Sequence, residues 1–223
     1  LVRHVGIDGI YIDDTDLDRI GMQRARKIMA RGRAGSLVDL HSADLYWGMF
    51  GMASCANLYM NLLPYVDRLW SGESFEYTRT SPDYWLVELS GIPFGVTNDL
   101  LFCELPNNPW RGAVYGMTMR VPNGGERYDP RPIWKMWKEF GIADTKMFGY
   151  WEKNCPVRAD HKDILATAYV GKNKTLIAIA SWAEKTTKAR LKIDWKALGL
   201  NRRKAVLRAP RIENFQEARS SLT

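Results

Sequence analysis

The spacing of hydrophobic residues changes near residue 160. Before that point, short apolar runs rich in β-branched residues alternate with stretches whose apolar residues recur at helical spacing. Strands that alternate with helices are typical of parallel βαβ units. The predicted strands are residues 5–13, 36–41, 66–73 and 92–98, and the predicted helices are 15–31, about 43–63 and 82–90.

These units predict an α/β fold that is part of a (β/α)8, TIM-type barrel. Four units supply about half of such a barrel, which typically has about 250 residues. The chain opens with Leu1 directly before the first predicted strand. We therefore read it as the C-terminal half of a barrel and expect the missing N-terminal units in the full-length protein.

A different pattern follows in the last part of the chain. Residues 163–182 hold two apolar runs joined by the polar segment 171–174, which is typical of a β-hairpin. Residues 190–195 and 204–210 continue as strands. We predict barrel over residues 1–155, including an amphipathic helix at 131–141, and a small antiparallel β-sandwich over 156–223.

Composition and cysteine usage exclude several classes of protein. The chain has 223 residues, of which 46% are hydrophobic and 26% charged, as in ordinary globular proteins. No apolar run approaches the roughly 20 residues of a membrane span. Three cysteines without metal-type spacing argue against a disulfide framework or a zinc site. We expect no metal and no cofactor, and for the full-length protein a secreted or periplasmic location.

The net charge of +7 is unevenly distributed along the chain. Residues 1–151 carry 16 Lys and Arg against 18 Asp and Glu, and residues 152–223 carry 16 against 7. The basic residues of the last part alternate with apolar ones, for example over 188–196, which suits the solvated face of strands. No nucleic-acid-binding motif accompanies them. We therefore expect no nucleic-acid partner.

Polar side chains stand where the predicted strands end. The first strand ends in Asp13 and Asp14, the second carries Asp39 and His41, the third ends in Glu73, and the fourth ends at Asn98 and Asp99. Ligands of parallel barrels bind at these C-terminal ends. Alternation along the first strand puts Gly9, Tyr11 and Asp13 on one face. We take it as the inner face, because a glycine there leaves room inside a crowded barrel. The acidic residues of 14–18 have an alternative role, because carboxylates at a helix N-terminus cap the helix and complement its dipole. We expect this role for Asp16 and Asp18.

Aromatic residues accompany these carboxylates. Glu73 lies close to Trp70, Phe75 and Tyr77 in the sequence, and an apolar setting raises the pKa of a carboxyl as a general acid requires. The alternative is that Glu73 is an ordinary exposed glutamate of a loop. Aromatic rings beside carboxylates suit sugars, whose C–H faces stack on rings. The candidate substrate-binding residues are Tyr11, Asp39, His41, Trp70, Asn98 and Trp110, although His41 fits a core histidine equally well.

Several segments carry a resemblance to known families. The strand 8–13, "DGIYID", resembles the nucleophile strand of barrel glycosidases such as glycoside hydrolase family 31, with Asp13 as the nucleophile. Longer segments resemble bacterial proteins related to glycoside hydrolase family 123, among them "DGIYIDDTDLDR", "WLVELSGIPFGV", "NPWRGAVYGMTMR" and "DPRPIWKMWKEFGI". This second resemblance covers nearly the whole chain.

The resemblance to family 123 implies a substrate-assisted mechanism. Its members resemble β-N-acetylgalactosaminidases in which an adjacent Asp–Glu pair acts at a strand end. The Asp orients the substrate acetamide and the Glu is the acid. The matching pair here is Asp13–Asp14, so the acid position departs from the pattern.

We therefore predict a glycoside hydrolase that acts on a glycan or glycoconjugate. Asp13 is the expected nucleophile or orienting base, and Asp14 or Glu73 the acid. If Asp13 and Glu73 are the working pair, their carboxyl groups should lie about 5–5.5 Å apart in a retaining enzyme or about 6.5–9.5 Å apart in an inverting one. The alternative is a barrel that binds carbohydrate without turnover. We expect little hydrolysis by the isolated chain, since loops after all eight strands form such sites.

Overall fold

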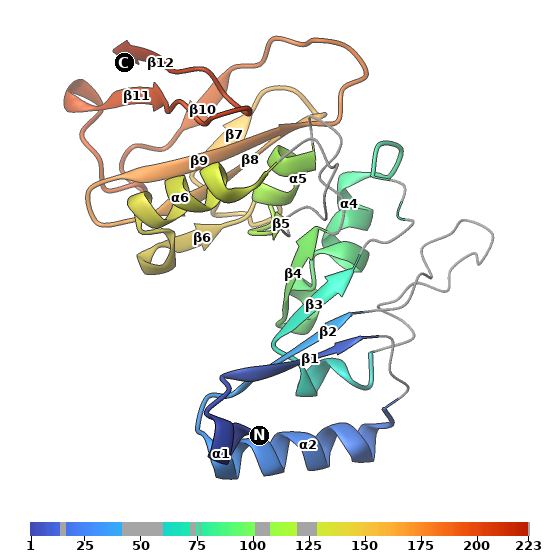
Figure 1. Cartoon of the computed structure of the whole chain (residues 1–223). Helices are drawn as coiled ribbons and strands as arrows, with labels where there is room; N and C mark the ends of the chain where they lie inside the picture. The colour runs from blue at the N-terminus through green and yellow to red at the C-terminus, as the bar shows by residue number, and fades with distance from the viewer. Residues whose placement is uncertain are drawn as a thin grey trace. The chain divides into compact units, whose positions relative to one another are not determined.

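The chain forms two compact units, Leu1–Phe102 and Cys103–Thr223. Figure 1 shows the computed structural model of the whole chain. The structure describes residues 1–13, 17–41, 60–71, 75, 77–100, 108–119 and 129–222.

A parallel sheet forms the centre of the first unit. Four strands of this five-stranded sheet lie within Leu1–Phe102, namely β1 (Gly9–Asp13), β2 (Leu37–His41), β3 (Arg68–Ser71) and β4 (Thr97–Leu100). They lie side by side in chain order, and each neighbouring pair is parallel. The helices and helical turns of this unit are α1 (Val2–Val5), which precedes β1, α2 (Arg19–Gly32), a 3-10 turn (Leu63–Tyr65), α4 (Pro82–Tyr84), a π-helical turn (Trp85–Leu89) and a second 3-10 turn (Ile92–Phe94). The predicted parallel α/β arrangement is confirmed.

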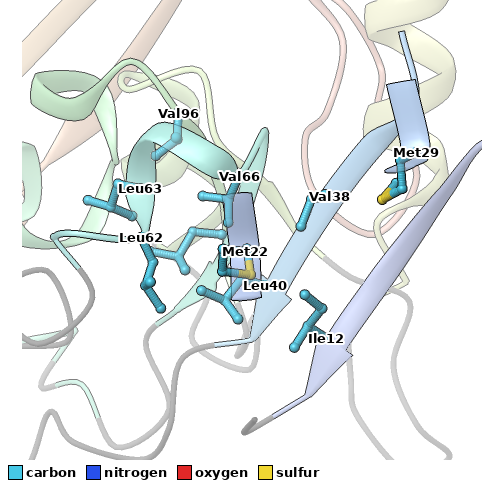
Figure 2. Packing of buried hydrophobic residues seen from close by; sticks show 10 residues of the cluster. Ile12, Met22, Met29, Val38, Leu40, Leu62, Leu63, Val66 and Val96 are labelled. Carbon is cyan, nitrogen blue, oxygen red and sulfur yellow. The ribbon is translucent and has the colours of Figure 1, made fainter. Parts of the chain in front are cut away.

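One face of this sheet is apolar and packs against α2. Figure 2 shows Ile12 of β1 and Val38 and Leu40 of β2 beside Met22 and Met29 of α2. The helix begins after Asp18, whose carboxylate accepts a hydrogen bond from the Gly21 backbone N–H at 2.6 Å. This N-cap confirms a capping role for Asp18. Ile10 of β1 packs against the same cluster. Because side chains alternate along a strand, the residues between these positions on β1 and β2 face away from α2.

The glycine at the start of β1 has a packing reason that differs from the predicted one. A Cβ atom at Gly9 would lie 2.4 Å from the Leu37 carbonyl oxygen. The sequence suggested that Gly9 leaves room inside the barrel. Instead, the missing side chain lets the β1 backbone approach β2.

The predicted strand at 92–98 is partly wrong. Its first half is the 3-10 turn Ile92–Phe94, and strand β4 begins only at Thr97. Pro93 lacks a backbone N–H, and Gly91 and Gly95 on either side have φ of +73° and +72°, which strands do not allow. The predicted helix at 82–90 is a short α turn followed by a π turn. Most of the helix predicted at about 43–63 lies outside the described residues.

The second unit is built on antiparallel strands. The sheet β6-β8-β9 consists of Lys146–Phe148, Ile164–Val170 and Thr175–Ser181; β10 (Leu191–Ile193) pairs with β7 (Val157–Ala159), and β11 (Val206–Ala209) with β12 (Arg219–Leu222). The remaining elements are α5 (Asn108–Ala113), β5 (Thr118–Met119), α6 (Arg131–Phe140) and 3-10 turns at Ile142–Asp144 and Arg202–Lys204. The predicted hairpin and antiparallel region are confirmed.

Helix α5 packs against the antiparallel strands of the second unit. The Tyr169 hydroxyl of β8 donates to the Ala113 carbonyl at 2.5 Å, and the Thr167 hydroxyl donates to the Val114 carbonyl at 2.7 Å. The Arg111 guanidinium donates to the Ser181 carbonyl at 3.0 Å. Residues 103–155 therefore lie in the same compact unit as the β-hairpin. The domain division expected from the sequence at 155/156 stays a prediction.

Cys155 is a buried free thiol whose Sγ lies 3.2 Å from the Val157 carbonyl oxygen. Among the described residues, no helix is both long enough and apolar enough to cross a membrane.

Candidate functional site

Seven polar and aromatic residues lie on the sheet face that turns away from α2. We call this the site face, and its residues are Tyr11 and Asp13 of β1, Asp39 and His41 of β2, Arg68 and Trp70 of β3, and Asp99 of β4. Strand register places Asp13, His41, Trp70 and Asp99 in one row across the sheet. This row lies near the C-terminal ends of the strands, where parallel barrels bind ligands.

Asp13 is held by two neighbours on the site face. His41 Nδ1 lies 2.6 Å from Asp13 Oδ1, and the Tyr11 hydroxyl donates to the same oxygen at 3.2 Å. The hydrogen bond from His41 lowers the pKa of Asp13, with a smaller contribution from Tyr11, although burial opposes the shift. An ionised carboxylate only accepts hydrogen bonds, so Nδ1 carries the hydrogen. Asp13 is thus a fixed, ionised carboxylate whose side chain is 63% exposed.

Three rings form a wall beside this carboxylate. The Trp70 ring meets Tyr11 edge-on at 5.5 Å and His41 edge-on at 5.9 Å between centroids. The rings of Tyr11 and His41 are close to parallel, with centroids 6.4 Å apart. His41 therefore belongs to the site face and not to the apolar core, and its contact with a sugar stays a prediction.

An arginine joins two further carboxylates next to the wall. Arg68 donates through Nε and Nη2 to Asp39 Oδ2, at 3.1 and 2.5 Å, and its Nη1 lies 2.9 Å from Asp99 Oδ2. Burial raises the pKa of Asp99, and the Arg68 charge opposes this shift. The bond to Asp39 raises the pKa of Arg68, which keeps the guanidinium charged.

The structure brings together five of the predicted site residues and turns a sixth, Asn98, away from them. Tyr11, Asp13, Asp39, His41 and Trp70 share the site face. Asn98 does not, because its amide donates to the Leu89 carbonyl on the opposite side of the sheet. This is a correction: the register of β4 against β3 pairs Asp99 with Trp70 and Asn98 with the buried Leu69, so Asp99 and not Asn98 lies on the site face. Trp110 lies on α5 in the second unit, where it meets Phe215 edge-on at 6.4 Å.

Two predicted acids lie outside the described residues, namely Asp14 and Glu73. The expected distance between the carboxyl groups of Asp13 and Glu73 therefore stays a prediction. Sequence reasoning missed Arg68, although it stands two positions before Trp70 and alternation gives the two residues the same face. The described residues include no group of His, Cys, Asp or Glu that could hold a metal ion.

A carboxylate held beside an aromatic wall at the ends of parallel strands is the kind of site that carbohydrate-active barrels present. Residues 1–122 match the family model described as Glycoside hydrolase 123, TIM-barrel domain, and residues 129–222 match Glycoside hydrolase 123, C-terminal domain. The chain belongs to glycoside hydrolase family 123, and this membership implies a carbohydrate substrate. No curated protein matches the chain.

The matches also bear on fold and domain division. They identify the parallel sheet as part of the family's TIM barrel and the antiparallel strands as its C-terminal domain. The barrel match extends through α5 and β5, which pack within the second compact unit. The family division thus lies between 122 and 129, and the compact units divide after Phe102.

Proposed function

We propose that this protein hydrolyses the O-glycosyl bond of a glycan or glycoconjugate, with carboxylates at the barrel strand ends as catalytic groups. The observation that supports this most is the ionised Asp13 carboxylate, held by His41 and Tyr11 beside the Trp70 ring. Asp13 is the proposed nucleophile or orienting base. Asp14 or Glu73 is the proposed acid that protonates the leaving-group oxygen.

Two mechanisms use an ionised Asp13 differently. As a nucleophile, it attacks the anomeric carbon while the acid gives its proton to the departing oxygen. As an orienting base, it accepts the N–H of a 2-acetamido group, whose carbonyl oxygen then attacks the anomeric carbon. Both mechanisms need a carboxylate that stays charged and fixed, and the hydrogen bonds from His41 and Tyr11 supply these properties.

The remaining site-face residues have roles in binding. Trp70 and Tyr11 offer ring surface on which a sugar face can stack, and Asp39 offers carboxylate oxygens to sugar hydroxyls. Trp110 stays a proposed stacking residue of the second unit. Asn98 is not retained, since its amide is engaged with the Leu89 carbonyl.

A second candidate function is carbohydrate binding without turnover. The observation that favours it is Asp14, which stands where the family pattern has a glutamate acid. The side chain of aspartate is one methylene shorter than that of glutamate, so its carboxyl reaches less far into a site.

Asp13→Asn and Glu73→Gln in the complete native polypeptide test the proposal on aryl glycosides with and without a 2-acetamido group. We expect kcat to fall about 10²–10⁴-fold in Asp13→Asn, with sugar affinity within a few-fold of the parent. Substrate assistance would confine hydrolysis by the parent to the 2-acetamido substrates.

The matched control is Asp8→Asn, because Asp8 is an exposed carboxylate whose Oδ1 pairs with Arg33 at 2.6 Å just before β1. It should leave kcat unchanged. A parent protein that binds the sugars but hydrolyses none of them would support the second candidate function instead.

A further inference from the structure

Residues 185–211 carry the positive charge of the chain, and we call them the basic segment. They hold ten Lys and Arg residues against one acidic residue, Asp194, which gives a net charge of +9. The other residues of the chain hold 22 Lys and Arg against 24 Asp and Glu, which gives −2. All ten basic residues of the segment are exposed.

Strand β10 presents part of this charge on a face that the core does not use. Leu191 and Ile193 of β10 pack against the cluster that contains the buried Val157 of β7, so alternation turns Lys192 to solvent. In the antiparallel ladder, Lys192 stands directly opposite Arg158 of β7. Like charges directly opposite each other destabilise a pair of strands. The ladder thus keeps two cations together on its solvent face.

Arg158 is held in place by backbone carbonyl groups. Its Nη2 donates to the carbonyls of Glu152 and Lys153 at 2.6 and 3.1 Å, and its Nη1 donates to the Tyr150 carbonyl at 3.4 Å. Carbonyl oxygens fix the guanidinium without cancelling its charge. The charge of Arg158 therefore remains available to an anion.

Two carboxylates flank this pair of cations, and the backbone engages both. Asp160 Oδ1 accepts the backbone N–H of Arg190 at 2.7 Å, and Asp194 Oδ1 accepts the backbone N–H of Ala197 at 2.9 Å. In the part of the chain that the structure describes, neither carboxylate forms an ion pair with Lys192. The carboxylates serve the turns at the two ends of the ladder and leave the cations unneutralised.

The positive charge continues beyond β10. Arg203 and Lys204 lie in the 3-10 turn Arg202–Lys204, and Arg208 lies on β11. In Figure 1, β10 and β11 lie above β9, and α6 lies below it. The cations belong to two separate ladders and the turn between them, so they form an extended surface and not one pocket.

Solvation alone does not explain charge of a single sign. A surface that only keeps a protein in solution mixes positive and negative side chains, as the rest of this chain does. Cations that gather on one surface repel each other, and an anionic partner removes this repulsion. The basic segment therefore indicates a partner that carries many negative charges.

The side chains between the cations indicate which class of polyanion fits. The one aromatic residue of the segment, Trp195, is half-buried, so rings on which nucleic-acid bases stack are lacking. Val206 and Leu207 are exposed, but as consecutive residues of β11 they face opposite sides and form no joint apolar wedge for a lipid surface. Family membership implies a carbohydrate substrate. A polysaccharide with many carboxylates offers the groups that Lys and Arg bind.

We propose that the basic segment, together with Arg158, is a docking surface for a carboxylate-bearing polysaccharide. Binding occurs through charge along the polymer and keeps its glycosidic bonds at high local concentration around the protein. This inference goes beyond the proposed function, because docking needs no hydrolysis. It rests on that function only in taking the polyanion to be a glycan.

The first test measures binding of the complete chain to polygalacturonate, with dextran as the uncharged polysaccharide. Isothermal titration calorimetry gives the dissociation constants at about 50 mM and about 300 mM NaCl. We expect binding to polygalacturonate that weakens roughly tenfold or more at the higher salt concentration, and no binding to dextran. Absence of binding to polygalacturonate at low salt, or equal binding to both polysaccharides, overturns the inference.

The second test removes two positive charges at a time. Lys188→Gln/Lys192→Gln changes the β10 region, and Arg203→Gln/Lys204→Gln changes the 3-10 turn. Each should weaken binding to polygalacturonate about tenfold, because two contacts between opposite charges are lost.

The matched control is Lys138→Gln/Lys172→Gln, which removes two exposed cations of the same unit outside the basic segment. It should keep the dissociation constant within about twofold of the parent. All of these residues are exposed, so the variants should keep the circular dichroism spectrum of the parent. An equal loss in all three double variants would mean that only the net charge of the protein acts, which overturns the docking surface.

Two further ligands test the class of the partner. They are vesicles of phosphatidylcholine with phosphatidylserine and a single-stranded DNA oligonucleotide, both at the lower salt concentration. Weaker binding of these ligands than of polygalacturonate supports the assignment. Tighter binding of either one, lost in the same double variants, assigns the surface to a lipid or a nucleic acid and overturns the polysaccharide.

Failure of the inference and failure of the proposed function are distinguishable. Hydrolysis of small uncharged aryl glycosides should be unchanged in the double variants, and Asp13→Asn should bind polygalacturonate as the parent does. A parent that hydrolyses aryl glycosides but binds no polygalacturonate overturns only the inference. A parent that binds polygalacturonate but hydrolyses no glycoside overturns only the proposed function.

Discussion

At the scale of single residues, the site depends on the contact between His41 and Asp13. The His41 ring contributes more to the lowered pKa of Asp13 than the Tyr11 hydroxyl does. A carboxylate whose pKa is lower in the folded state stabilises the fold at pH values above its unfolded pKa. That stabilisation is lost as the pH falls through the folded pKa.

His41→Ala should raise the pKa of Asp13, because it removes the 2.6 Å hydrogen bond. Carbon-13 NMR of the aspartate carboxyl groups measures the titration directly. The acid-side limb of the pH profile of kcat/KM should move to higher pH together with the pKa of Asp13. Tyr11→Phe is the graded control, since it removes only the weaker 3.2 Å bond and should raise the pKa less. The assignment fails if Tyr11→Phe has the larger effect or His41→Ala has none.

At the scale of elements, each strand divides its residues between α2 and the site. On β2, Leu40 is 1% exposed and packs under α2, whereas Leu37 is 55% exposed on the site face. The two leucines are three residues apart on one strand, so they compare the two faces with the same change of side chain.

Leu40→Ala should lower the free energy of unfolding by about 2–5 kcal/mol, because it leaves a cavity between the sheet and α2. Leu37→Ala should change it by less than about 0.5 kcal/mol, since this side chain is already half in water. Urea denaturation followed by circular dichroism measures both. Equal losses in the two variants would contradict the assignment of faces.

At the scale of the whole molecule, the structure divides the chain into two compact units after Phe102. Residues 103–223 keep α5 on the antiparallel sheet, including the hydrogen bonds from Tyr169 and Thr167. Residues 156–223, the domain expected from the sequence, lack α5, α6 and strand β6. Each buried polar group that loses its partner costs about 1–3 kcal/mol.

We expect the segment 103–223 to unfold cooperatively and the segment 156–223 to be at least about 3 kcal/mol less stable or unfolded. The segment 129–223, which follows the family division, should fall between them because it keeps α6 but loses α5. Chemical denaturation of the three segments provides the measurement, with Tyr169→Phe in 103–223 as a control for one of the lost bonds. A fully stable 156–223 would contradict this expectation and support a domain boundary at 155/156.

The sequence by itself determined the order of strands and helices, the change to an antiparallel region, and the strand-end position of Asp13. These features follow from local patterns: period-two alternation, helical spacing and turn residues, all of which act over a few neighbouring positions. The motifs by themselves also carried the resemblance to the family.

Only the tertiary structure decided which side chains meet. Asn98 and Asp99 are neighbours in the sequence, and the register of β4 against β3, which pairs Asp99 with Trp70 and Asn98 with Leu69, decides which of them lies on the site face. The approach of Arg68 to Asp39 and Asp99 joins three strands. The packing of α5 against β8 and β9 joins residues more than 50 positions apart. Such contacts depend on register and on burial across the whole fold, which local patterns do not contain.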